Sequence, residues 1–555
     1  MPEGVFCVLN VYRFDTRIFP LYFCIRTKTE RKMKRFAFIL PLLAALLQGC
    51  GKNGPDAPEM VDDSTLAHGM IVLGEQLEDP YSVRNITKAL VSLYPTKAGT
   101  VNVKATHLYV RFLPRGDYDF AVLDSLGVEL LDHPVDYRVV REGDWYHDPE
   151  IPEGEITWQY AVVPPGFSFP EGIPYEVLDE CHIAEQPLAT RSDDGIDWEA
   201  VERESFRLTG NLDMYPETRG GSKTTAKPKG RITILDPLYS SEPIGVAGVC
   251  VSCNVFVKFC RAFTDADGYY EMKESYSANP RYRLFFNNKK GFMIGRNLIY
   301  VPGSFSTLGK HGPEGCSVHV TNRSDRSLFA RCVVNNAGWD WFELCKSEAG
   351  KISQPPSGLQ IWLLDALDCS SAVMLKQGSP LDKLFKELIG DYSPLINFFL
   401  PDITLGIKDL DDYASIYSTA IHELSHASHY AQVGKDWWSK FEKYILVSYV
   451  TSGFVTYGAG TEDGNGYCEV AEMWGYFAEG SVFNKRYPGR NYYPGTSWWF
   501  KPQVFRYLDD RGLNRYKIFA ALLPAVIDRT SLQNELLILY PEAASMIRMA
   551  FNRYK

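Results

Sequence analysis

Residues 420–430 read Ala-Ile-His-Glu-Leu-Ser-His-Ala-Ser-His-Tyr and form the strongest local signal in this sequence. They place His422 and His426 four positions apart, and on an α-helix residues i and i+4 share one face. Two imidazoles on one face can bind the same metal ion. Glu423, beside the first imidazole, lies close enough to take a proton from a water held there. The stretch therefore predicts a helix that carries a metal site.

The flanking residues favour the same helix. Asp409, Asp411 and Asp412 offer a cap and negative charge at its start, and Gly434 is a plausible end. The alternative is a buried helix whose histidines only complete hydrogen bonds in the core. With 10 histidines in 555 residues, a chance match to the motif has a probability of about one in a hundred, which favours the metal site.

A zinc site needs a third protein ligand and an open position for water. Metzincins carry a glycine three residues after the second histidine and a further ligand three residues later. Here those positions hold His429 and Gln432, so the stretch does not resemble a metzincin. We expect His429 to support the site or the fold rather than to bind the metal. The remaining choice is a glutamate from a second helix.

Candidate glutamates follow a glycine-rich turn at residues 460–466. After that turn, residues 467–479 read Tyr-Cys-Glu-Val-Ala-Glu-Met-Trp-Gly-Tyr-Phe-Ala-Glu, which is helical in pattern, and Tyr457-Gly458 precede the turn. Together with His-Glu-x-x-His, this segment resembles the gluzincin clan of zinc metallopeptidases. The closest likeness is to the lethal-factor-type branch, in which Tyr-Gly precedes a ligand helix bearing Glu-x-aromatic-small. The resemblance covers these two short motifs.

The resemblance implies a Zn²⁺ cofactor and a third ligand from this second helix. Matched on the pattern, Glu472-Met-Trp-Gly475 assigns the ligand to Glu472. Glu469, one turn earlier on the same face, remains the alternative. The resemblance also implies that Tyr457 helps to stabilise the oxyanion, although this segment is rich in tyrosine.

The N-terminus has the features of an export signal. Met33-Lys-Arg begins a charged region, an apolar run follows from Phe36 to Leu47, and Gln-Gly-Cys50 closes it. The apolar run is too short to span a bilayer. Residues 33–50 resemble a bacterial lipoprotein signal, which implies lipidation of Cys50 and anchoring of an exported protein to a membrane, in particular the outer membrane, facing the periplasm or the surface. Residues 1–32 then look like an over-extended start, and residues 51–74 form a tether.

Composition describes an ordinary globular chain. The formal charge is −10, which does not suggest a nucleic-acid partner, and 45% of residues are hydrophobic. Twelve cysteines are present, and nine remain once Cys7, Cys24 and Cys50 are set aside. Cys250 and Cys253 lack a second matching pair, so we expect a disulfide or core thiols there rather than a metal site.

The chain is expected to be multidomain. We predict a β-rich domain of unknown role over 75–216, with strands at 107–113 and 157–163, and a linker over 217–229. Residues 230–300 resemble the carboxypeptidase-regulatory-like module, a transthyretin-like or immunoglobulin-like β-sandwich. Residues 301–555 would form an α+β zincin-like domain with strands at 359–365 and 403–407, a candidate helix at 381–389, and a helical C-terminal subdomain.

These expectations combine into one function, the hydrolysis of peptide bonds in proteins or peptides by a membrane-anchored zinc metallopeptidase. Glu423 would be the general base. One alternative is an anchored binding protein for a glycan or peptide with a structural or vestigial zinc site. A second alternative is a surface assembly protein that uses its first β domain as an interface.

Overall fold

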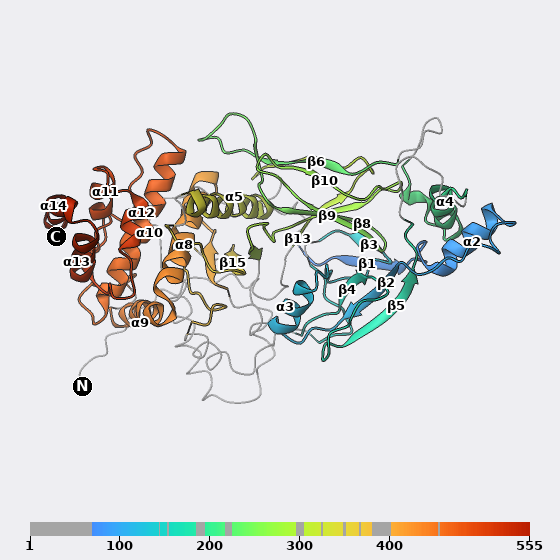
Figure 1. Cartoon of the computed structure of the whole chain (residues 1–555), viewed down its shortest axis with the longest axis horizontal. Helices are drawn as coiled ribbons and strands as arrows, with labels where there is room; N and C mark the ends of the chain where they lie inside the picture. Colours follow the sequence, from blue (N-terminus) through green and yellow to red (C-terminus); the bar gives the residue numbers. More distant parts are fainter. Residues whose placement is uncertain are drawn as a thin grey trace, which may run out of the picture. The chain divides into compact units, whose positions relative to one another are not determined.

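The computed structural model describes residues 69–143, 145–152, 155–184, 195–216, 225–295, 305–322, 326–347, 351–365, 368–379, 401–452 and 455–555. All of them belong to one compact unit. The predicted start, signal and lipidated Cys50, most of the tether, most of the linker and the candidate helix at 381–389 lie outside the described residues. Figure 1 shows sheets in the first half of the described chain and mainly helices in the second.

The N-terminal part, up to residue 216, combines strands with helices. Its main sheet is antiparallel, in the order β4-β2-β5, and β1 pairs with β3. The strands are β1 (Val72–Gln76), β2 (His107–Phe112), β3 (Tyr137–Arg141), β4 (Gln159–Val163) and β5 (Tyr175–Cys181). The helices are α2 (Val83–Leu93), α3 (Asp117–Ser125) and α4 (Trp198–Leu208). The predicted strands at 107–113 and 157–163 are confirmed, whereas the helices were not predicted, and β1 begins inside the expected tether.

The middle of the chain forms two sheets. One has the order β13-β11-β8-β9 and the other β10-β6-β14, with β7 attached to β6. Their strands are β6 (Lys229–Ile234), β7 (Ile244–Gly245), β8 (Cys250–Val255), β9 (Lys258–Phe263), β10 (Tyr269–Glu271), β11 (Arg281–Phe285), β13 (Phe305–Lys310) and β14 (Val318–Val320). Ile232, Val251 and Leu284 of the two sheets share one hydrophobic core. We call residues 225–295 of this region the β module.

The expected boundary at 300/301 does not separate two structural units. β13 and β14 follow that position but pair with β11 and β6 of the β module. Conversely, β12 (Phe292–Gly295) precedes it but joins β15 (Leu359–Leu364) and β16 (Ile403–Gly406) in a parallel sheet. The two regions therefore exchange strands, because each needs the other's backbone groups to complete its sheet.

The helices of the second half carry the predicted motifs. They are α5 (Arg326–Ser347), α8 (Tyr413–Val433), α9 (Lys435–Thr451), α10 (Asn465–Arg486), α11 (Gln503–Asp509), α12 (Arg515–Ala520), α13 (Arg529–Leu539) and α14 (Ala544–Arg553). Asp412 caps α8 by accepting a hydrogen bond from the Ser415 N–H, and Gly434 ends it with φ +81°. The predicted helix and its two ends are thus confirmed.

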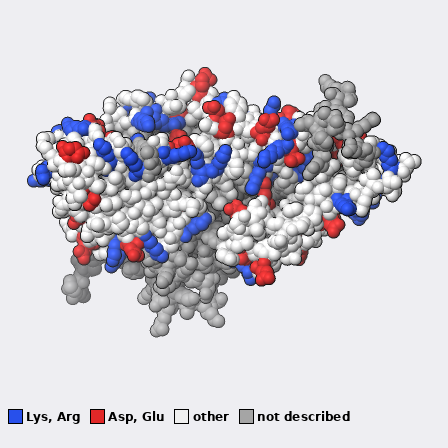
Figure 2. Space-filling model, viewed as in Figure 1, with Lys and Arg blue, Asp and Glu red and all other residues white. Residues whose placement is uncertain are grey.

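The cysteines and the surface add two observations. The nine cysteines of the described chain are all buried, and Cys250 and Cys253 are free core thiols there. Within the same residues, no helix has both the length and the apolar character to cross a bilayer. On the face shown in Figure 2, basic and acidic side chains are interspersed among the described residues, and neither sign forms a continuous field.

Candidate metal centre

Three side chains from two helices meet at one buried point. His422 and His426 come from α8, and Glu472 comes from α10. The two Nε2 atoms lie 3.0 Å apart. Each lies 3.5 Å from an oxygen of the Glu472 carboxylate. These residues could hold a metal ion, because their ligand atoms all lie within 4.8 Å of one another.

The spacing of these atoms suits a small divalent ion. Tetrahedral ligands bound to zinc at about 2.0–2.1 Å would stand about 3.3 Å from one another. The observed separations of 3.0 and 3.5 Å lie on either side of that value. The donor set of two imidazoles and one carboxylate leaves a fourth position for water, as in catalytic zinc sites.

A glycine keeps space beside the two histidines. A Cβ atom added to Gly475 would lie 2.8 Å from Nε2 of both His422 and His426. Any side chain there would therefore press on the two nitrogen atoms that face the candidate ion. This close approach explains why a glycine, Gly475, follows Glu-Met-Trp in the sequence.

The structure separates the two glutamates that the sequence left open. Glu472 is fully buried with the imidazoles. Glu469, one turn earlier, instead lies 3.5 Å from the guanidinium of Arg529 on α13. Of the two, Glu472 joins the cluster, and Glu469 links α10 to the C-terminal helices.

A third glutamate of α10, which sequence reasoning missed, orients His422. Oε2 of Glu479 lies 3.1 Å from Nδ1 of His422, and its other oxygen accepts a 2.7 Å hydrogen bond from the Tyr492 hydroxyl. A carboxylate on the far nitrogen of a metal-binding imidazole selects the tautomer whose Nε2 is free to bind. The sequence could have pointed to this residue, because Glu479 follows Glu472 by seven residues, or about two helical turns, and so lies on the same face of the helix.

The ionisation of the cluster follows from its carboxylates. Burial alone would lower the pKa of His422, but hydrogen bonds to Glu472 and Glu479 outweigh it and raise that pKa. Burial opposes ionisation of Glu472, yet its interactions with both imidazoles lower its pKa. Burial lowers the pKa of His426. In the metal-free chain His422 therefore carries the proton that a metal ion must displace.

Glu423, the predicted base, is completely buried next to His422. An extended segment at residues 369–374 forms an isolated antiparallel bridge with β16, through reciprocal backbone hydrogen bonds between Ser371 and Thr404. Burial, followed by the charges of Asp368 and Glu423, raises the pKa of the Cys369 thiol to about 12. Because the parallel sheet has the order β12-β15-β16, this segment covers the outer edge of β16.

His429 lies away from the ligand atoms. Its ring packs between Trp437 and Trp438, with centroid distances of 4.7 and 5.7 Å. Neither ring nitrogen has a hydrogen-bond partner among the described residues, and burial lowers its pKa to about 3. His429 is thus a neutral imidazole within an aromatic cluster, which accords with the expected supporting role in the fold.

Tyr457 is connected to His422 indirectly, through a second tyrosine. Its hydroxyl lies 3.3 Å from the hydroxyl of Tyr476, and the Tyr476 ring packs edge-on against His422 with centroids 4.5 Å apart. Tyr457 has φ +62°, which is unfavourable for an aromatic residue. Tyr444 and Trp499 hold this backbone by donating hydrogen bonds to the Tyr457 carbonyl.

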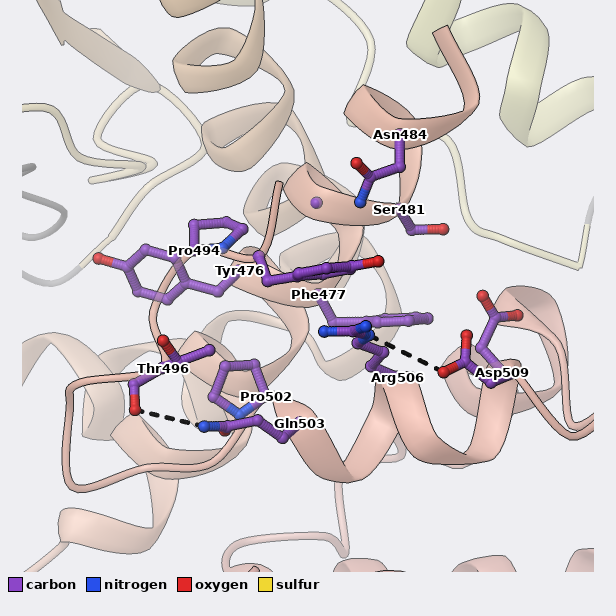
Figure 3. A pocket seen from close by; sticks show the side chains of 13 residues that line it. Tyr476, Phe477, Ser481, Asn484, Pro494, Thr496, Pro502, Gln503, Arg506 and Asp509 are labelled. Atoms are coloured by element: carbon purple, nitrogen blue, oxygen red, sulfur yellow. Dashed lines mark hydrogen bonds and ion pairs between the residues drawn. The ribbon is translucent and has the colours of Figure 1, made fainter. Parts of the chain in front are cut away.

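A pocket lies beside α10, and its lining includes Tyr476, whose ring packs against His422. It has a volume of about 160 Å³ and is lined by Tyr476, Phe477 and Arg506, among others. Figure 3 shows these side chains around the opening, and the Gln503 amide donating to the Thr496 carbonyl at 3.2 Å. The pocket contains none of the three candidate ligands.

Comparisons with known proteins gave no match, either among protein-family models or among curated proteins.

Proposed function

We propose that this protein is a zinc-dependent metallopeptidase of the gluzincin type. The observation that carries the proposal is the convergence of His422, His426 and Glu472 from two helices onto one point. Gly475 leaves room at that point, and Glu479 orients the first imidazole. Three ligands with a carboxylate base next to them match a catalytic zinc site better than a structural one, which uses four.

A zinc ion bound there would polarise a peptide carbonyl and lower the pKa of a water molecule toward about 7. Glu423 accepts the proton of the attacking water and then donates it to the departing amine. Tyr457 is our candidate for the donor that stabilises the oxyanion. Its hydroxyl contacts that of Tyr476, whose ring packs against His422.

We further propose that the enzyme is exported and tethered to a bacterial membrane through lipidated Cys50, with proteins or peptides as its substrates. The sequence at 33–50 supports the anchor. The β module would then be an integral part of the enzyme, since it exchanges strands with the region of the metal helices.

Replacing the base tests this proposal directly. In Glu423→Gln we expect zinc content near one per chain and hydrolysis of unfolded protein reduced by about 10²- to 10⁴-fold. Glu442→Gln is the matched control, because Glu442 is also a buried carboxylate but lies outside the cluster. Full hydrolysis by Glu423→Gln would contradict the mechanism. A well-folded wild-type chain that binds no zinc would favour the anchored binding protein instead.

A further inference from the structure

The partly buried guanidinium of Arg486, whose side chain is 13% exposed, joins the last turn of α10 to three other parts of the fold. Its Nε and Nη2 atoms both lie 2.9 Å from the Asp236 carboxylate, which follows β6 of the β module. Its Nη1 donates to Asp340 of α5 at 3.0 Å. Its carbon centre lies 4.7 Å from the ring centroid of Tyr417 on α8. One side chain thus contacts the β module, α5 and α8 at once.

The hydroxyl groups around Arg486 reinforce this junction. Tyr417 donates to Asp340 at 2.8 Å, and Tyr487 donates to Asp236 at 2.8 Å. Asp236 is completely buried, so its carboxyl group needs these hydrogen-bond partners in place of water. Because the guanidinium is planar with donors on several sides, it can bridge two carboxylates from different elements, which a lysine ammonium cannot reproduce.

Arg486 also belongs to the row of α10 side chains that face α8. Glu472, Glu479 and Arg486 follow one another at intervals of seven residues, and therefore lie on one face of α10. Their contacts on α8 run in the opposite direction. Glu472 meets His426, Glu479 meets His422 and Arg486 meets Tyr417. The two helices are thus aligned by successive polar contacts, of which Arg486 makes the last.

We infer that Arg486, anchored by Asp236 of the β module, is a positioning residue for the metal centre. By holding the end of α10 against α8, it fixes the position of α10 along α8, and with it the positions of Glu472 and Glu479 relative to the two imidazoles. This role rests on the proposed metal site, and extends it by making the β module a determinant of metal affinity. The β module would affect metal affinity through the contact of Asp236 with Arg486, and it would supply no ligand atom itself.

Metal binding by the full chain tests this role apart from stability. We expect zinc affinity, measured by chelator competition, to fall about tenfold or more in Arg486→Gln, the range seen when groups supporting a metal ligand are removed. Arg486→Lys should recover part of that loss, because it retains the charge near Asp236. The Co²⁺ absorption spectrum should shift in both variants, since it reports ligand geometry. Asp340→Asn, at a partly exposed partner, provides a milder change if Arg486→Gln fails to fold.

Arg283→Lys is the matched control. Arg283 is more deeply buried than Arg486, and it bridges Asn254 and His133 rather than side chains of α8 or α10. The Arg283→Lys variant should have a lower melting temperature than the wild type, with the same zinc affinity and the same Co²⁺ spectrum. If the Arg486 variants behave like this control, the positioning role is wrong while the metal site stands. If the wild-type chain binds no metal, both the site and the role fail.

Discussion

The α-carbon of Gly475 faces His422 so closely that a methyl group in its place would lie 2.8 Å from Nε2 of that imidazole. The same methyl group would lie equally close to Nε2 of His426. Gly475 sits in the middle of α10, where glycine is normally unfavourable. The helix thus retains a poor helix former at the position where only a hydrogen atom fits beside both nitrogen atoms.

Gly475→Ala should therefore separate metal binding from helix stability. Alanine would ordinarily stabilise a helix interior by about 1 kcal/mol relative to glycine. Here we expect zinc affinity to fall at least about tenfold, because the methyl group displaces the two imidazoles from the ligand positions. Gly480→Ala on the same helix is the control, since its added Cβ would meet Pro494 and Tyr492 instead of the histidines. Equal zinc affinity in both variants would contradict this account.

The two candidate glutamates can be distinguished by metal content. We expect Glu472→Gln to lose bound zinc, because a neutral amide replaces the carboxylate that faces both imidazoles. Glu469→Gln should keep about one zinc per chain and lose about 1 kcal/mol or less, since its ion pair with Arg529 is partly exposed. Metal analysis and thermal unfolding of the two proteins check both statements. Zinc lost with Glu469 but retained without Glu472 would reverse the assignment.

Zinc affinity should rise with pH. The pKa of His422 is raised above its usual value near 6.5, whereas that of Glu472 is lowered. Between pH 6 and 8 the metal must therefore displace one proton from His422, and affinity should increase about tenfold per pH unit. Titration calorimetry in two buffers of different ionisation enthalpy measures that proton. Binding without proton release would show that His422 is already neutral.

The same raised pKa has a consequence for the metal-free fold. A histidine that binds its proton more tightly in the folded chain stabilises that chain fully below pH about 6.5. This contribution is lost as the pH rises through the higher folded pKa. Added zinc should therefore raise the melting temperature more at pH 8 than at pH 6.

Glu442 of α9 should make the fold less stable in alkaline solution. Burial raises its pKa to about 8, although a hydrogen bond from Ser379 opposes the shift. The folded chain thus binds this proton more tightly than the unfolded chain, so the free energy of unfolding falls as the pH rises from about 4.3 through 8. Glu442→Gln, which cannot ionise, should match the wild type near pH 5 and exceed it by about 2–4 kcal/mol near pH 9.

Urea denaturation of the metal-free proteins at the two pH values measures this difference. Glu542→Gln is the control, because residue 542 is exposed and its carboxyl group remains hydrated in both states. A Glu442 variant that gains nothing on going from pH 5 to pH 9 would mean that this carboxylate has access to water.

What the sequence predicted well was local. Asp412 and Gly434 mark the two ends of α8 as expected, because a capping side chain and a glycine with positive φ act within one helical turn. The spacing of His422 and His426 fixed their common face for the same reason. Selecting Glu472 over Glu469 depended on how α10 faces α8, and both glutamates fit the helical pattern. That choice was settled by tertiary packing, in which Arg529 takes the other carboxylate.

What the sequence could not predict were pairings between distant segments. No local pattern in β12 indicates that it pairs with β15, nor in β14 that it pairs with β6. The boundary after residue 300, expected from the resemblance of residues 230–300 to a β-sandwich module, is therefore one that the sheets cross. Asp236 and Arg486 were missed in the same way, because they are 250 positions apart and neither belongs to a recognisable motif.

The exchanged strands also govern the order in which a newly made chain can fold. On the ribosome, β6 emerges well before β14, and β12 well before its parallel neighbour β15. Strand pairs between distant segments close slowly, and their open edges attract other chains until they are covered. The β module can therefore reach its final form only after the polypeptide through β15 has been synthesised. Completion of the β module is therefore a late step that waits for β14 and β15.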